Sequence, residues 1–164
     1  PLIVMSPKSL LRHPECISDI ADMEEGKTFQ ELLDDPAVGP RSGKKIKRLL
    51  LCTGKVYYDL LAHKRDNERD DVAIVRLEQL YPLPGEQLKK VFKKYSAATP
   101  IWVQEEPSNM GAWQYMNAIF LSKEIGLDVE LQLISRKSSA SPATGFKKVH
   151  AEQQERIITE AFGE

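Results

Sequence analysis

Residues 101–113 read Ile-Trp-Val-Gln-Glu-Glu-Pro-Ser-Asn-Met-Gly-Ala-Trp, and this stretch decides the fold. Three large apolar residues are followed at once by polar residues, a proline and a glycine, and then an amphipathic segment begins. This order predicts a buried strand whose carboxyl end leads into a polar loop and then into a helix. Ligands and partner surfaces gather at such strand ends in open α/β sheets. We therefore expect this loop to do more than turn the chain.

The same order of strand and helix continues on both sides of this stretch. Each predicted strand is a short apolar run, and the strands are 46–53, 72–77, 101–103 and 129–134. Each predicted helix has apolar residues three and four positions apart, and the helices are 55–69, 86–95, 111–126 and 146–162. Regular alternation with short connections favours a mostly parallel sheet with helices on both faces. The predicted fold class is therefore α/β, with three layers arranged α/β/α.

The first 43 residues have weaker periodicity. Residues 1–6 predict a short strand, and residues 28–33 predict a short helix that ends before Pro36. We place a domain boundary at residue 44, so that 1–43 is an N-terminal strand with a variable linker segment and 44–164 is the α/β domain. The opening residues, Pro-Leu-Ile-Val-Met, resemble the middle of a strand, and we expect the chain to be a piece of a longer polypeptide.

Composition excludes several classes of partner. The net charge of −1 provides no overall attraction to nucleic acid or to an anionic membrane. No apolar run approaches the roughly 20 residues that span a bilayer. The two cysteines form no Cys-x-x-Cys motif, which favours a reducing, cytosol-like compartment. The sequence therefore predicts a globular domain that binds neither nucleic acid nor membrane.

Common signatures of catalysis and phosphate binding are missing from the sequence. It contains no Gly-x-Ser-x-Gly elbow, no His-Glu-x-x-His motif and neither of the glycine-rich phosphate loops. Cys52 lies in an apolar run, where packing in the core is its simplest role. We predict no catalytic, cofactor-binding or metal-binding residue in this chain. A small hydrolase using Cys16 or a serine is an alternative that the missing elbow disfavours.

Basic residues crowd the approach to the first predicted strand, in the segment 41–48. Their simplest interpretation is a solvated strand entry. The alternative is an anion site for phosphate or a nucleotide, formed by Lys45 and Arg48. Arg136 and Lys137 follow the last predicted strand, and they join this site only if the fold brings the two segments together.

Glu105 and Glu106 are neighbours at the end of the strand in 101–113. Side chains of adjacent residues on an extended backbone point in opposite directions, so these carboxylates make a poor acid–base pair. One of them could cap the following helix or pair with a base across an interface. We favour an interface or loop-fixing role for Glu105, Glu106 and Trp113 over catalysis.

Several stretches resemble, in order along the chain, one enzyme family. They are Met5-Ser-Pro-Lys-Ser-Leu-Leu-Arg-His-Pro14, Cys52-Thr-Gly-Lys-Val-Tyr-Tyr-Asp-Leu60, Val72-Ala-Ile-Val-Arg-Leu-Glu-Gln-Leu-Tyr-Pro82, Gln104-Glu-Glu-Pro107 with Gly111-Ala-Trp113, Ser139-Ala-Ser-Pro-Ala143 and Lys148-Val-His150. Together they resemble the C-terminal region of 2-oxoglutarate dehydrogenase, the thiamine-diphosphate-dependent decarboxylating component of its complex. Residues 15–44 match only loosely. Met110 stands where the family pattern leads us to expect Gln.

The resemblance implies a transketolase C-terminal-like domain with an assembly or regulatory role. In that architecture thiamine diphosphate and Mg lie between two other domains, across a homodimer interface. The family's Gly-Asp-Gly cofactor motif is absent here. The resemblance therefore implies that this chain alone is inactive and holds no cofactor.

For the full-length protein, the resemblance implies oxidative decarboxylation of 2-oxoglutarate in the tricarboxylic acid cycle, with transfer of succinyl to lipoyl-lysine. Its partners would be the lipoyl-bearing succinyltransferase and dihydrolipoamide dehydrogenase. The location would be the bacterial cytoplasm, which we favour, or the mitochondrial matrix if the source is eukaryotic. Some members bind acetyl-CoA as an activator, and the cations Lys45, Arg48, Arg136 and Lys137 are candidates for its phosphates. The main alternative is a stand-alone nucleotide- or acyl-CoA-binding α/β module.

Overall fold

The computed structural model describes residues 1–164, and the chain divides into two compact units, Pro1–Gln30 and Glu31–Glu164. Within the first unit, regular structure is limited to two 3-10 helices, η1 (Lys8–Leu10) and η2 (Ile20–Met23).

The strand predicted for residues 1–6 is wrong in this structure. The segment has no regular secondary structure, and Leu2, Ile3, Val4 and Met5 are all exposed. A strand is defined by its hydrogen-bonded neighbour, and no segment of the chain pairs with these residues. An apolar, β-branched composition alone is therefore not sufficient to make residues 1–6 a strand.

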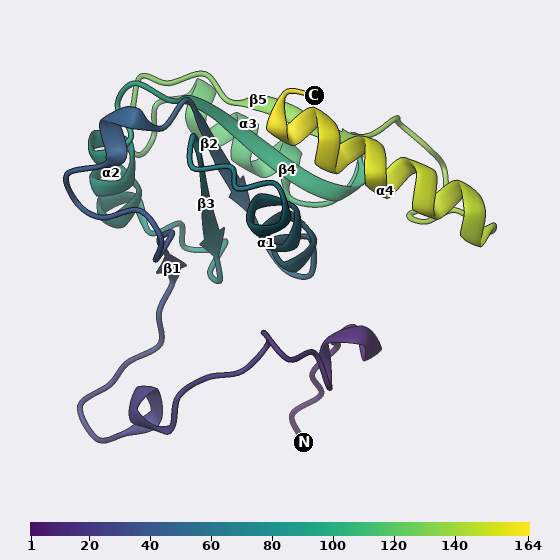
Figure 1. Cartoon of the computed structure of the whole chain (residues 1–164), viewed down its shortest axis with the longest axis horizontal. Helices are drawn as coiled ribbons and strands as arrows, with labels where there is room; N and C mark the ends of the chain where they lie inside the picture. The colour runs from purple at the N-terminus through teal and green to yellow at the C-terminus, as the bar shows by residue number, and fades with distance from the viewer. The chain divides into compact units, whose positions relative to one another are not determined.

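The second unit is built on a five-stranded sheet in the order β1-β3-β2-β4-β5 (Figure 1). The strands are β1 (Leu32–Leu33), β2 (Arg48–Cys52), β3 (Val72–Leu77), β4 (Thr99–Pro107) and β5 (Gln132–Arg136). All neighbouring pairs run parallel except β1 with β3, which is antiparallel. The carboxyl ends of β2, β3, β4 and β5 therefore meet at one edge of the sheet.

Helices cover both faces of this sheet. The α-helices are α1 (Val56–Asp66), α2 (Gly85–Lys94), α3 (Trp113–Leu121) and α4 (Lys147–Phe162), and a 3-10 helix, η3 (Gly43–Lys45), precedes β2. Helices α1 and α4 share one hydrophobic cluster with the sheet, and α2 and α3 share the other. The predicted three-layer α/β/α class is confirmed. None of these helices combines the length and apolar content needed to cross a bilayer.

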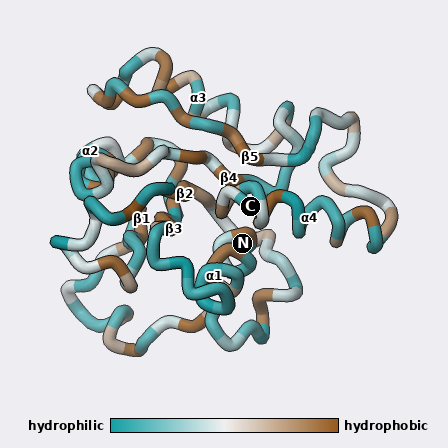
Figure 2. Tube along the Cα trace, turned by 45° about the horizontal axis from the view of Figure 1, so that its top comes forward, coloured by the Kyte–Doolittle hydropathy of each residue, from teal (hydrophilic) through white to brown (hydrophobic).

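The core lies on both faces of the strands because parallel strands are covered from both sides. In β2, Leu50 and Cys52 pack toward α1 and α4, whereas Leu49 and Leu51 pack toward α2 and α3. Trp102 of β4 is completely buried. Figure 2 shows hydrophobic stretches on the strands and on α3, whereas α1 is largely hydrophilic.

The helix predicted for residues 28–33 is wrong, because Leu32 and Leu33 form β1 instead. The compact second unit accordingly starts at Glu31, and it includes the segment 31–43 that lies before our boundary at residue 44. Asp35 attaches this segment to the domain. Its buried carboxylate accepts from the backbone N–H of Ile74 at 2.9 Å and pairs with Lys64 at 2.6 Å.

Candidate functional site

The polar loop after β4 is organised by Gln104, whose side chain is buried. Its Oε1 accepts from Trp102 Nε1 at 2.9 Å and from the backbone N–H of Trp113 at 3.1 Å. Its Nε2 donates to the carbonyl oxygens of Met110 at 2.8 Å and Pro107 at 3.1 Å. One satisfied amide thus ties the end of β4 to the start of α3.

Gly111 is required by this arrangement. Its φ of +69° lies in the left-handed region, and a Cβ there would stand 3.0 Å from Gln104 Oε1. Met110 contributes only its backbone carbonyl to Gln104. The departure from the family pattern at residue 110 therefore leaves this hydrogen bond intact.

The two glutamates of β4 have different surroundings, as their alternation on a strand predicts. Glu105 is half-buried and pairs with Lys55 Nζ at 2.9 Å, and Lys55 also binds Asp59 at 2.8 Å. Burial acts to lower the pKa of Lys55, but the hydrogen bonds to Asp59 and Glu105 outweigh it and raise the pKa. Glu106 is exposed. Glu105 therefore joins β4 to the start of α1, which is the kind of contact a loop-fixing role requires.

Trp113 is half-buried at the first position of α3 and packs against the cluster shared by α2 and α3. Its backbone is held by Gln104, as described above. These contacts are of the kind that a loop-fixing role requires, and the choice between that role and an interface stays a prediction.

Arg48 caps the carboxyl end of α4. Its Nε donates to the carbonyl of Ala161 at 2.8 Å and its Nη2 to that of Glu160 at 2.9 Å. The last carbonyls of a helix lack partners within the helix, so a cation there stabilises the helix end. Gly163 follows with φ +77°, and a Cβ at this residue would lie 3.1 Å from Arg48 Nη1.

The four cations proposed as one anion site lie at opposite edges of the sheet. Arg48 is the first residue of β2 and pairs with Thr99, the first residue of β4. Arg136 is the last residue of β5 and pairs with Pro107, the last residue of β4. Lys45 precedes β2 and Lys137 follows β5. Parallel strands place all their starts at one edge and all their ends at the other. The structure therefore does not unite the two pairs.

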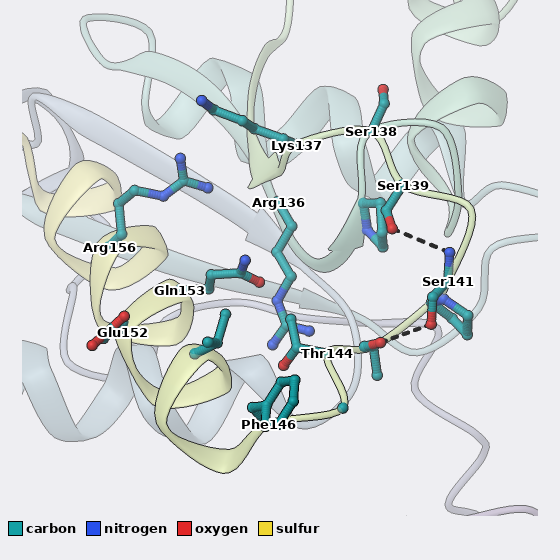
Figure 3. Close-up of a pocket in the computed structure, with 15 residues that line it drawn as sticks. Arg136, Lys137, Ser138, Ser139, Ser141, Thr144, Phe146, Glu152, Gln153 and Arg156 are labelled. Carbon is teal, nitrogen blue, oxygen red and sulfur yellow. Dashed lines mark hydrogen bonds between the residues drawn. The ribbon is translucent and has the colours of Figure 1, made fainter.

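Arg136 and Lys137 line a cavity of about 760 Å³ at the carboxyl ends of β4 and β5 (Figure 3). The rest of its wall comes from the loop 138–145 and the first turns of α4, including Arg156. Arg136 is buried, and its Nη2 donates to His150 Nδ1 at 2.9 Å. The charges on the wall are three cations and one carboxylate, from Glu152. This cavity is therefore a candidate site for a ligand with negative charge.

The fold and this cavity define a class: a three-layer α/β domain with a polar recess at the carboxyl edge of a mostly parallel sheet. A family model described as "2-oxoglutarate dehydrogenase C-terminal" matches residues 17–162. This chain belongs to that family.

Relatives support the same assignment over nearly the whole chain. The 2-oxoglutarate dehydrogenase E1 component of Haemophilus influenzae and the oxoglutarate dehydrogenase of Buchnera aphidicola are each 44% identical over 99% of this chain. The multifunctional 2-oxoglutarate metabolism enzyme of Mycobacterium sp. (strain KMS) is 43% identical over 99%. This chain spans 17% of the length of the first two proteins and 13% of the third.

Sequence analysis missed Gln104, Thr144 and Arg156 as site residues. For Gln104 a signal existed, because it is the polar residue between a buried apolar run and two acids. Arg156 and Thr144 reach the cavity only because α4 folds back beside β5, and no local pattern records that packing.

Proposed function

We propose that this chain is the C-terminal assembly and regulatory domain of a 2-oxoglutarate dehydrogenase E1 component. The observation that carries the proposal is the match along 99% of this chain with only 17% of the E1 relative from Haemophilus influenzae. A domain that forms so small a part of the protein, with its own complete core, suits a supporting role.

The longer protein would oxidatively decarboxylate 2-oxoglutarate and transfer succinyl to lipoyl-lysine. Thiamine diphosphate with Mg would supply the decarboxylation chemistry when bound. The family's Gly-Asp-Gly cofactor motif is absent from this chain, and we assign the cofactor to other domains of the longer protein.

The proposed partners follow from membership of the same complex. They are a second copy of the protein in a homodimer, the lipoyl-bearing succinyltransferase and dihydrolipoamide dehydrogenase, in a bacterial cytoplasm. Acetyl-CoA stays a proposed effector of the longer protein. The four cations Lys45, Arg48, Arg136 and Lys137 do not form one site for it, because they lie at two edges of the sheet.

A stand-alone nucleotide- or acyl-CoA-binding module is the second candidate function. The cavity beside Arg136 favours it, because three cations and several hydroxyl side chains line its wall. The coverage of the E1 relatives favours the first candidate.

The experiment that tests the first candidate compares the longer protein with and without residues 31–164. Sedimentation would report the dimer, and decarboxylation of 2-oxoglutarate with an artificial electron acceptor would report activity. We expect the shortened protein to lose the dimer and most of its turnover. A shortened protein that remains dimeric and fully active would overturn the proposal.

A further inference from the structure

Buried polar atoms without a hydrogen-bond partner concentrate at the cavity beside Arg136. The chain has four such side-chain atoms, and three of them belong to residues of this wall: Arg136 Nε, Thr144 Oγ1 and Arg156 Nε. Buried polar groups are almost always paired, so each exception asks for an explanation. Three exceptions around one cavity point to a ligand that accepts hydrogen bonds.

The charges around these atoms favour an anion. Arg136 and Arg156 supply guanidinium groups and Lys137 an ammonium group. The one carboxylate, that of Glu152, is exposed and lies 3.9 Å from Lys148 Nζ, so solvent and a neighbouring cation screen it. Arg156 Nε lies 3.8 Å from Glu160 Oε1, which is too far for a hydrogen bond.

The start of α4 adds further donors beside the cavity. The helix begins at Lys147, no side chain caps it, and its first turn contains no acidic residue. Its first N–H groups therefore have no partner within the helix, and they favour a negative charge. Figure 3 shows Arg136 reaching toward Thr144 and Phe146 at this end of the cavity.

The remaining wall suits an organic group. Phe146 is 77% exposed and Val149 is 38% exposed, and both line the cavity. A volume of about 760 Å³ exceeds what a lone inorganic anion fills. An exposed aromatic ring beside hydrogen-bond donors can pack against the organic part of a ligand whose charged group those donors bind.

We propose that this cavity binds a small organic phosphate. The phosphoryl oxygens accept from Arg136 and Thr144, Arg156 and Lys137 add positive charge farther along the wall, and the organic group packs against Phe146 and Val149. A phosphate carries up to two negative charges at neutral pH and a carboxylate carries one, so these cations favour the phosphate. This inference concerns binding only, so its outcome is independent of the deletion experiment on the longer protein.

Phenyl phosphate is the probe that tests the proposal, because it joins one phosphate to one aromatic ring. Titration of the 164-residue chain, followed by amide chemical shifts, should saturate and should move the signals of residues 139–146. Two matched probes serve as controls: benzoate, which carries a carboxylate, and phenol, which is uncharged. Each should bind at least about tenfold more weakly than phenyl phosphate. Equal binding of benzoate would overturn the choice of phosphate.

Two pairs of variants locate the site. Arg156→Gln should weaken phenyl phosphate about tenfold or more, whereas Lys45→Gln, which removes an exposed cation at the other edge of the sheet, should not. Thr144→Val should also weaken binding, and Thr144→Ser, which keeps the hydroxyl, should preserve it. Absence of saturable binding to the wild-type chain would contradict the proposal. Binding that is unchanged in correctly folded Arg156→Gln and Thr144→Val proteins would do so equally.

Discussion

At the level of single residues, the loop after β4 depends on side chains that no short motif identifies. Gln104 is polar and buried, and its amide satisfies four groups from the strand, the loop and the first residue of α3. Local reasoning placed a functional loop here and named the two glutamates, which are more conspicuous. We expect the buried amide to have the larger structural effect, because its hydrogen bonds to Trp102 and Pro107 are buried.

We predict that Gln104→Ala lowers the free energy of unfolding by about 3 kcal/mol, because buried donors and acceptors lose their partners. The matched control is Glu106→Ala, which removes an exposed side chain two residues away and should change it by less than about 0.5 kcal/mol. Urea unfolding of both variants measures the difference. Equal effects would show that the loop does not depend on Gln104.

Trp113→Ala should lower the free energy of unfolding by about 2–3 kcal/mol. Truncating a fully buried large aromatic side chain lowers the free energy of unfolding by more than this. The smaller value is expected here because Trp113 is only half-buried. Thermal unfolding of the variant, with Gln114→Ala as the exposed neighbouring control, measures this loss. An unchanged melting temperature would assign Trp113 to a surface contact with another protein or domain.

The two cysteines should differ in reactivity. Burial raises the pKa of the Cys52 thiol from 9.0 to about 12, whereas Cys16 is exposed. Between these pH values unfolding lets Cys52 ionise, so its contribution makes stability fall as pH rises above 9.0. In native protein at pH 8 we expect a thiol reagent to modify Cys16 rapidly and Cys52 only on unfolding. Rapid modification of folded Cys16→Ser protein would contradict the buried position of Cys52.

At the scale of helices and strands, hydrophobic patterns predicted an element correctly where its own residues carry the period of a strand or a helix. The β-branched run 72–77 predicted β3 with its observed bounds, and the apolar spacing of 146–162 predicted α4 to within one residue. The two-residue strand β1 was not predicted, because it is defined only by its pairing with β3. Whether the four proposed cations form one site could not be predicted from the sequence, because it depends on the edge of the sheet at which each cation lies.

Arg48→Met should loosen the end of α4, because the carbonyls of Glu160 and Ala161 lose their charged donor. We expect a loss of about 1–2 kcal/mol in unfolding free energy. Amide hydrogen exchange should quicken in the last turn of α4 and leave α2 unaffected. Lys45→Met, three residues earlier and exposed, serves as the control. If both variants exchange alike, Arg48 is not the cap.

At the scale of the whole molecule, this chain is one domain that matches 17% of the length of its E1 relative from Haemophilus influenzae. The domain from Glu31 to Glu164 has two buried clusters and helices on both faces of its sheet. Fold class followed from local sequence because alternation of strand and helix leaves few topologies. The family resemblance provided the biological context, which no composition or periodicity could supply.

The most direct measurement is 2-oxoglutarate decarboxylation by the purified 164-residue chain in the presence of thiamine diphosphate and Mg. The longer E1 protein under the same conditions is the positive control. The account predicts turnover from the longer protein and none above background from the chain alone. Decarboxylation by the chain itself would contradict the central claim that its residues support a reaction carried out elsewhere.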